Sequence, residues 1–332
     1  MTVRCLILLL GASPLMAQES QLPRGLVERP IVVGTKPTAL PGTLTLPEGP
    51  GPFPGVVLVH GSGPNDRDET IGGTKPFRDL AWGLASKGVV VLRYEKRTRA
   101  APYYFIGRRY TVDDEIVIDA VLALEQLRAQ PEVDPGRTVA LGHSLGGMMM
   151  PRIAARDARL AGVVIMAGAT TSTFADIIER QIRYLAALPP SDTAGLGAMR
   201  QFLEPAVPAL RALSAADTAT PMMFSSAPAS YWYSLMSYDM PAASREVRVP
   251  MLVLQGGRDY QMTVADLEAW QRGVGPMPAL TVKVYPLLNH PFVAGTGAST
   301  PSEYKLPGRV ASEVIADIAS WVLSLPSAAS PP

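Results

Sequence analysis

Short runs of apolar, mostly β-branched residues alternate with longer segments of helical periodicity along this 332-residue chain. Continuous apolar runs of this kind are typical of strands buried on both faces of a sheet. They occur at Gly55–Val59, Val89–Leu92, Val139–Leu141, Gly162–Met166 and Met251–Leu254. The helical segments are Phe77–Lys87, Val112–Ala129, Met148–Arg156, Thr263–Gly273 and Arg309–Leu325. This alternation predicts βαβ units and a mostly parallel central sheet with helices on both faces.

Edge strands and one long insertion complete the expected organisation. The edge strands are Ile31–Val33, Gly42–Pro47 and Thr281–Tyr285. Residues 171–246 contain no buried-strand run but hold helical pieces separated by proline-rich joints (174–187, 199–213 and 231–238), and we interpret them as a helical cap. We expect an unstructured lead over residues 18–30, one domain with its cap over 31–325, and a disordered tail over 326–332.

The N-terminus has the composition of a signal peptide. Arg4 precedes the apolar run Cys5–Leu10, and small residues follow up to Ala17. The run is too short for an ordinary membrane span, although a membrane anchor or a disordered N-terminus is the alternative interpretation. We expect residues 1–17 to be removed and the protein to be exported, either periplasmic or secreted, with no integral membrane span afterwards. Cys5 is the only cysteine, so the mature chain would contain neither a disulfide nor a thiolate.

Composition and motifs narrow the classes of partner and cofactor. The formal net charge is +1, which gives no reason to expect nucleic acid or an anionic membrane surface as a partner. The sequence has no metal-ligand cluster, Walker motif or dinucleotide fingerprint, so we expect no metal and no cofactor. It does not indicate the oligomeric state.

The segment Gly142–Gly146 matches the pattern Gly-x-Ser-x-Gly directly after an expected buried strand. Such a strand-to-helix turn exposes the hydroxyl of its serine, here Ser144, as a nucleophile. A buried turn serine is the alternative. Pro151 lies in the helix expected after the turn, and it predicts a kink or a loosened turn because proline lacks a backbone N–H.

A serine nucleophile needs a base to take its proton. The chain has three histidines: His60 in a glycine-rich turn, His143 beside the serine, and His290 after the last expected strand. Loops that follow parallel strands meet at the carboxyl edge of the sheet, where ligands bind in open α/β sheets. His290 is therefore the expected base, with a packing histidine as the alternative, and we expect His60 to be structural.

The third member of a catalytic triad is an acid that orients the histidine. Asp259 lies in a short Gly-Gly turn after the Met251–Leu254 strand. The alternative is Asp176, which follows the preceding strand but lies within a helical pattern. A side chain in this short turn needs less reach to contact His290, so we assign Asp259 as the acid. The alternative is that this aspartate only bonds the backbone of its own turn. The order serine, aspartate, histidine is that of the α/β-hydrolases.

Two backbone N–H groups are candidates for an oxyanion hole, those of Ser62 and Leu145. Two charged segments, Asn65–Glu69 and Arg93–Arg97, also follow expected strands, and we favour an ion network that braces these loops over a role in substrate binding. The cap residues Tyr231, Trp232 and Tyr233 could equally line an acyl pocket or form the core of the cap.

Several longer motifs carry a resemblance to a known family. They are His60–Glu69, Lys75–Ala81, Val91–Arg97, Gly142–Met148 and Pro151–Ala154. From Gly42 to Leu325 the chain resembles bacterial α/β-hydrolases of the EstD-type carboxylesterase group, which are related to dienelactone-hydrolase-like and acyl-peptidase-like enzymes. The resemblance implies an α/β-hydrolase fold, a triad of Ser144, Asp259 and His290, and activity on short acyl esters.

The sequence therefore predicts a serine hydrolase that cleaves small-molecule carboxylic esters through an acyl-enzyme on Ser144. A peptidase or an acyltransferase with the same triad is the alternative enzyme, because these differ in pocket shape and in the group that accepts the acyl chain. A non-catalytic binding protein would be expected to lack a triad position, and none is missing.

Overall fold

The computed structural model describes residues 21–190, 201, 203–219 and 227–327. Within these residues one sheet has the strand order β1-β2-β4-β3-β5-β6-β7-β8. The strands are β1 (Leu26–Val33), β2 (Leu40–Pro47), β3 (Phe53–Val59), β4 (Val90–Tyr94), β5 (Val133–His143), β6 (Gly162–Met166), β7 (Met251–Gly256) and β8 (Leu280–Tyr285). Strand β2 is antiparallel to β1 and β4, and the other pairs are parallel. The expected mostly parallel sheet is confirmed.

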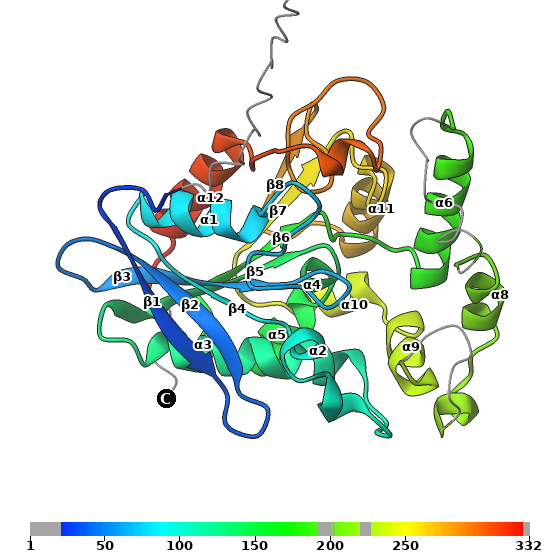
Figure 1. Cartoon of the computed structure of the whole chain (residues 1–332), viewed down its shortest axis with the longest axis horizontal. Helices are drawn as coiled ribbons and strands as arrows, with labels where there is room; N and C mark the ends of the chain where they lie inside the picture. The colour runs from blue at the N-terminus through cyan, green and yellow to red at the C-terminus, as the bar shows by residue number, and fades with distance from the viewer. Residues whose placement is uncertain (1–20, 191–200, 202, 220–226, 328–332) are drawn as a thin grey trace, which may run out of the picture.

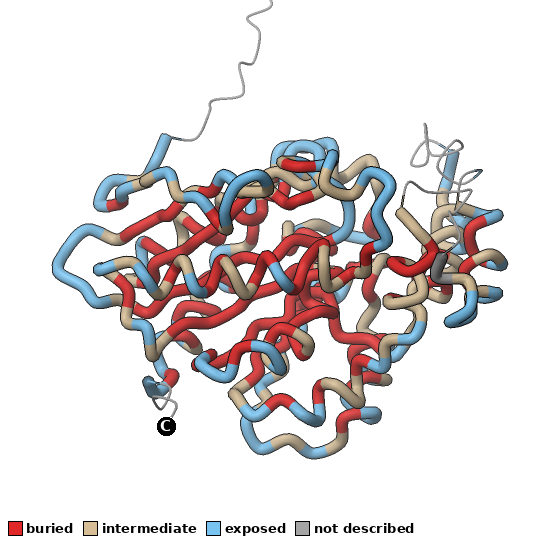
Figure 2. The backbone as a smooth tube through the Cα atoms, turned by 90° about the horizontal axis from the view of Figure 1, so that it is seen from below, coloured by how far each residue is buried: buried red, intermediate tan, exposed pale blue. Residues whose placement is uncertain are grey.

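Helices cover both faces of this sheet, as the fully buried strands β4, β6 and β7 require. Helices α1 (Pro76–Ala85) and α12 (Ser312–Ser324) pack together on one face, and α3 (Ile118–Arg128) and α5 (Met150–Arg156) lie on the other (Figure 1). Helix α11 (Val264–Val274) packs beside β7. Figure 2 shows the buried residues concentrated along the strands.

The helix after the serine turn is interrupted where Pro151 predicted a loosened turn. Helix α4 (Leu145–Met148) ends before Met149, and α5 begins at Met150 with Pro151 in its first turn. Proline is well tolerated there, because the first N–H groups of a helix have no partner within the helix. The predicted interruption is confirmed.

The N-terminal lead is shorter than expected, because β1 already begins at Leu26. The prediction of an unstructured segment up to Pro30 is wrong for its last five residues. Strand β1 pairs only with β2, and an edge strand tolerates a proline. Its polar residues form ion pairs instead of marking a loop: Glu28 contacts Arg93 at 2.5 Å and Arg29 contacts Glu132 at 2.9 Å. The expected signal peptide, residues 1–17, lies outside the described residues, as does most of the expected tail.

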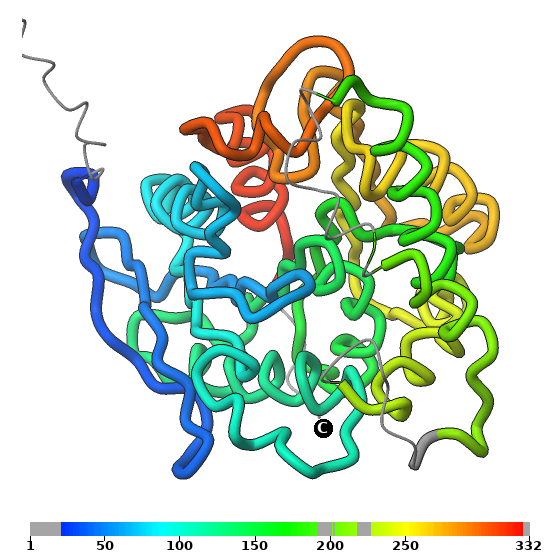
Figure 3. Tube along the Cα trace, turned by 45° about the vertical axis from the view of Figure 1, so that its right-hand side comes forward, coloured from blue at the N-terminus to red at the C-terminus, as the bar shows by residue number. Residues whose placement is uncertain are grey.

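The described part of residues 171–246 contains helices and no strand. These helices are α6 (Phe174–Ala186), α8 (Ala206–Arg211), α9 (Ala229–Met236) and α10 (Met240–Arg245), with a 3-10 turn at Ala215–Ala219. Helices α6, α8 and α9 gather at one end of the molecule, beside the carboxyl edge of the parallel strands (Figures 1 and 3). Ala175, Ile178, Val207 and Leu210 form a small separate core there. The segment is thus built as a helical cap. No helix in the described ranges is long and apolar enough to span a bilayer.

Candidate active site

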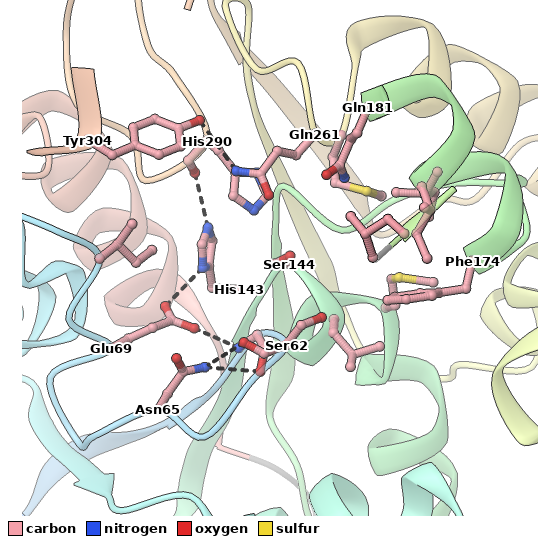
Figure 4. Close-up of a pocket in the computed structure, with 18 of the residues that line it drawn as sticks. Ser62, Asn65, Glu69, His143, Ser144, Phe174, Gln181, Gln261, His290 and Tyr304 are labelled. Carbon is pink, nitrogen blue, oxygen red and sulfur yellow. Dashed lines mark hydrogen bonds and ion pairs between the residues drawn. The ribbon is translucent and has the colours of Figure 1, made fainter. Parts of the chain in front are cut away.

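Ser144 stands on a strained turn between β5 and α4. Its backbone has φ 55° and ψ −120°, a conformation that residues other than glycine rarely adopt. The flanking glycines allow close backbone contact: a Cβ on Gly142 would lie 2.3 Å from the Gly146 carbonyl oxygen, and one on Gly146 would lie 2.2 Å from that of Val59. Ser144 is therefore presented at the end of β5 and lines a cavity (Figure 4).

His290 and Asp259 are hydrogen-bonded beside this serine. His290 Nδ1 lies 2.6 Å from Asp259 Oδ2, and His290 lines the same cavity as Ser144. Asp259 is 5% exposed, and its Oδ1 accepts the backbone N–H groups of Gln261 (2.8 Å) and Met262 (3.0 Å). The carboxylate is thus fixed by its own loop and can hold the ring of His290 in one orientation. The structure brings together all three residues that the sequence predicted.

The alternative acid, Asp176, has a different structural role. It lies in the first turn of α6, where its side chain forms a capping box with Thr173. It also pairs with Arg211 at 2.8 Å, and its side chain is 44% exposed. Asp176 therefore stabilises the cap, and the partner of His290 is Asp259.

The glycine-rich loop after β3 is held from both sides. The N–H of Gly61 donates to Glu69 Oε1 at 2.6 Å, and Lys96 Nζ donates to the Gly61 carbonyl at 2.8 Å. The Gly61 N–H is thus already engaged. Ser62, the next residue, lines the cavity together with Leu145, the first residue of α4.

Glu69 and His143 form a buried ion pair that the sequence did not predict. His143 Nδ1 lies 2.9 Å from Glu69 Oε2, and Nε2 donates to the carbonyl oxygen of His290 at 3.0 Å. Both side chains are almost fully buried, and Glu69 has a positive φ of 49°. Because His143 directly precedes Ser144, this ion pair links the serine turn to the glycine-rich loop and to the loop of His290 (Figure 4).

The hydrogen-bond partners of the two ring nitrogens determine the protonation state of His143. A carbonyl oxygen can only accept, so Nε2 must carry a hydrogen. Nδ1 faces a carboxylate, and two lone pairs at 2.9 Å would repel, so a proton must lie between Nδ1 and Oε2. Burial alone would lower the pKa of His143, but the charge of Glu69 raises it above its ordinary value. Burial alone would raise the pKa of Glu69, but His143 lowers it. The stable form is an imidazolium–carboxylate pair.

The charged segments that follow β3 and span the end of β4 form the ion network expected from the sequence. Arg67 pairs with Glu95 at 2.9 Å, and Arg93 pairs with Asp68 at 2.8 Å. Their positions at the ends of neighbouring strands bring these groups together. Asn65 and Glu69 also line the cavity, so the network reaches the site itself.

The cavity has a volume of about 530 Å³ and is closed on one side by the cap. Of the three aromatic residues that could either line a pocket or form the core of the cap, Trp232 lines the cavity, whereas Tyr231 and Tyr233 do not. Consecutive residues of a helix point about 100° apart, so only one of the three faces the cavity. Tyr231 instead donates to Glu115 Oε2 at 2.7 Å, and Glu115 pairs with Lys96 at 3.1 Å beneath the glycine-rich loop.

Chemically, this arrangement could allow His290 to take a proton from Ser144 and so activate the serine as a nucleophile. Among the described residues no group of three or more histidine, cysteine, aspartate or glutamate side chains is placed to hold a metal ion. The family model described as "Alpha/beta hydrolase family" matches residues 56–304. The chain belongs to the alpha/beta hydrolase family. The predicted fold class is thereby confirmed.

Individual relatives of this alpha/beta hydrolase agree with the family match. The chain is 39% identical over 305 residues to Esterase EstD of Thermotoga maritima, covering 91% of this chain and 68% of the relative. This relative supports the expectation of a carboxylesterase-type enzyme.

Solved structures share the fold at low sequence identity. An esterase of Pyrococcus furiosus is 15% identical with a TM-score of 0.58, covering 90% of this chain and 91% of that one. A proline iminopeptidase of Mycobacterium smegmatis is 18% identical with a TM-score of 0.53, covering 89% and 98%. The fold is therefore common to esterases and peptidases and does not distinguish them.

Proposed function

We propose that this protein is a serine hydrolase that cleaves carboxylic esters, with Ser144 as nucleophile, His290 as base and Asp259 as the orienting acid. The observation that carries the proposal is the strained Ser144, which shares a cavity with a histidine whose other ring nitrogen is held by a buried carboxylate. The similarity to Esterase EstD supports an ester as the substrate.

In this mechanism the Ser144 oxygen attacks the ester carbonyl carbon while its proton passes to Nε2 of His290. Asp259 accepts a hydrogen bond from Nδ1–H of His290, which fixes the tautomer and stabilises the imidazolium. The bond to the alcohol then breaks, and the leaving oxygen takes the proton from His290. Water attacks the acyl-enzyme, gives its proton to Nε2, and the carboxylic acid leaves as Ser144 recovers that proton.

The oxyanion of the tetrahedral intermediate would be stabilised by the backbone N–H groups of Ser62 and Leu145. Both residues line the cavity beside Ser144, and Leu145 begins α4. The engagement of Gly61 N–H by Glu69 supports the assignment of the next N–H along the chain, that of Ser62.

The acyl chain is proposed to be short. The cap contributes apolar side chains to the cavity, among them Phe174, Ile177 and Trp232, and the cavity volume of about 530 Å³ must hold both halves of the ester. Apolar contacts of this kind favour an unbranched acyl chain of a few carbons over a charged or strongly polar one.

A peptidase or acyltransferase with the same triad is the alternative. A panel of p-nitrophenyl esters from acetate to dodecanoate, with an aminoacyl p-nitroanilide as comparison, tests the proposal. We expect the highest kcat/KM for chains of about two to six carbons, with little turnover of the anilide. Faster cleavage of the anilide than of every ester would overturn the proposal in favour of a peptidase.

A further inference from the structure

One wall of the active-site cavity is polar but uncharged, and the structure so far gives it no role. Gln181 from α6, Gln261 from the loop after β7, and Tyr304 all line the cavity. Figure 4 shows Gln261 and Tyr304 next to His290, with Gln181 near them at the far end of α6 from Phe174. The cavity therefore has two chemically different ends.

This polar wall is built into the catalytic loop. The N–H of Gln261 donates to Asp259 Oδ1 at 2.8 Å, and its carbonyl accepts from Arg180 of α6 at 3.1 Å. Its side-chain Nε2 donates to the Tyr304 hydroxyl at 3.4 Å. Within the described part of the chain, the amide of Gln181 has no hydrogen-bond partner. Gln181 is therefore able to bond a ligand.

The chemistry of the triad decides which half of an ester meets this wall. His290 must give the proton it took from Ser144 to the oxygen of the leaving alcohol. The alcohol therefore lies on the His290 side, against Gln261 and Tyr304. The acyl chain lies on the opposite side, against the apolar residues of the cap.

The charge of the wall limits the alcohol further. Among the described residues that line the cavity there is no lysine or arginine, and the charge of His143 is already paired with Glu69, so an anionic group would find no free counter-charge. The carboxylate of Glu69 also lines the cavity, but it is paired with His143 and accepts from Gly61. Amide and phenol groups bond neutral hydroxyls through both donors and acceptors.

We propose that Gln181, Gln261 and Tyr304 form a subsite for the leaving group, and that the preferred substrates are short acyl esters of an uncharged polyhydroxy alcohol. This inference rests on the proposed esterase function and deepens it. An alkyl ester without these hydroxyls would cover the polar groups of the subsite without bonding them, so it should be a poorer substrate.

Two butanoate esters with the same carbon skeleton test the subsite. They are 1-glyceryl butanoate and propyl butanoate, which differ only in two hydroxyl groups. Both form the same butanoyl-enzyme, so any difference in kcat/KM arises before deacylation. Hydrolysis followed by pH-stat should give kcat/KM about tenfold higher for the glyceryl ester, from two hydrogen bonds of ordinary strength. Butanoylcholine, which carries a positive charge, should be slower than the glyceryl ester.

Variants locate the effect in the polar wall. Gln181→Leu combined with Gln261→Leu should reduce the ratio of the two kcat/KM values to about one. The control Ile177→Val alters the acyl side, so it should change both rates together and leave the ratio as in the wild type. Because each ratio is measured within one protein, a change in stability or in active fraction cancels.

The outcomes separate this inference from the proposed function. A wild-type ratio near or below one, with both esters hydrolysed, overturns the subsite and leaves the esterase in place. A tenfold ratio that persists in the double variant also overturns it. Failure to hydrolyse either ester, or any ester of the p-nitrophenyl panel, would overturn the proposed function itself.

Discussion

Nδ1 of His143, the residue directly before Ser144, lies 2.9 Å from Oε2 of Glu69. Through this pair three active-site loops contact one another. Glu69 accepts from the N–H of Gly61, and His143 donates to the carbonyl of the base, His290. The pair therefore fixes the relative positions of the glycine-rich loop, the serine turn and the histidine loop.

Substitutions of Glu69 test this positioning role. In Glu69→Gln the amide oxygen can accept from Gly61, and its NH₂ can donate to Nδ1 of a neutral His143, so every contact is retained. In Glu69→Ala the Gly61 N–H loses its acceptor. We expect kcat to fall on the order of 100-fold in the alanine variant, comparable to loss of one oxyanion donor, with a small change in KM. The glutamine variant should stay within about tenfold of wild type.

Steady-state kinetics and melting temperatures of both Glu69 variants distinguish positioning from simple support of the fold. A purely structural role would lower the melting temperature of Glu69→Ala while the folded fraction kept its wild-type kcat. That result would contradict the account.

Asp259→Asn should retain the fold but lose most of its activity. An amide can donate to the ring of His290 and so favour the wrong tautomer, and in another triad enzyme such a change costs kcat a factor of about 10⁴. The matched control is Asp176→Asn, which changes an exposed capping residue and should leave kcat nearly unchanged. Equal losses in the two variants, measured on one p-nitrophenyl ester, would refute the assignment of the acid.

Trp232→Ala should change the preference for acyl chain length more than it changes stability. Trp232 lines the cavity and packs against Phe174 with ring centroids 5.5 Å apart, so its removal enlarges the acyl side. We expect the best ester of the panel to become longer. Tyr233→Ala is the control, because Tyr233 does not line the cavity. An unchanged order of esters with a large fall in melting temperature would place Trp232 in the core of the cap.

His60 should make the protein less stable in acid. Burial lowers its pKa from 6.5 to about 4, and the ring packs against Phe77 and Tyr94. As pH falls from 6.5 to 4 the unfolded chain takes up a proton before the folded one does, so unfolding becomes more favourable. This group should contribute about 3 kcal/mol to that loss, and nothing further below pH 4.

Denaturant unfolding of wild type and His60→Gln at pH 7 and pH 4 measures this contribution. The variant should be less stable at pH 7 because it loses ring packing, but its stability should decline less between the two pH values. An equal decline in both proteins would show that His60 is not the group responsible.

The three residues of the proposed triad could be placed together from the sequence because each lies in a turn that follows a strand. Parallel strands bring such turns to one edge whatever the details of packing, so Ser144, Asp259 and His290 could be placed together. The positions of the strands and helices could be predicted from the period of the apolar residues. The start of β1 was missed because its polar residues, Glu28 and Arg29, are paired with partners far along the chain.

The Glu69–His143 pair could not be found in this way. Its members are 74 residues apart, and only the side-chain directions of a positive-φ glutamate and a turn histidine bring them together. The charged segment that contains Glu69 indicated that an ion pair forms near the glycine-rich loop, but it did not indicate that His143 is the partner. Likewise, the sequence left open whether Tyr231, Trp232 and Tyr233 line a pocket or form the core of the cap, and only the structure shows that Trp232 lines the cavity.

Covalent labelling with a fluorophosphonate probe tests the central claim most directly. An activated serine attacks phosphorus as it attacks an acyl carbon, so the intact protein should gain one adduct, and peptide mapping by mass spectrometry should place it on Ser144. Ser144→Ala should remain unlabelled under the same conditions. An adduct on another residue, no adduct on the wild type, or equal labelling of Ser144→Ala would contradict the assignment of the nucleophile.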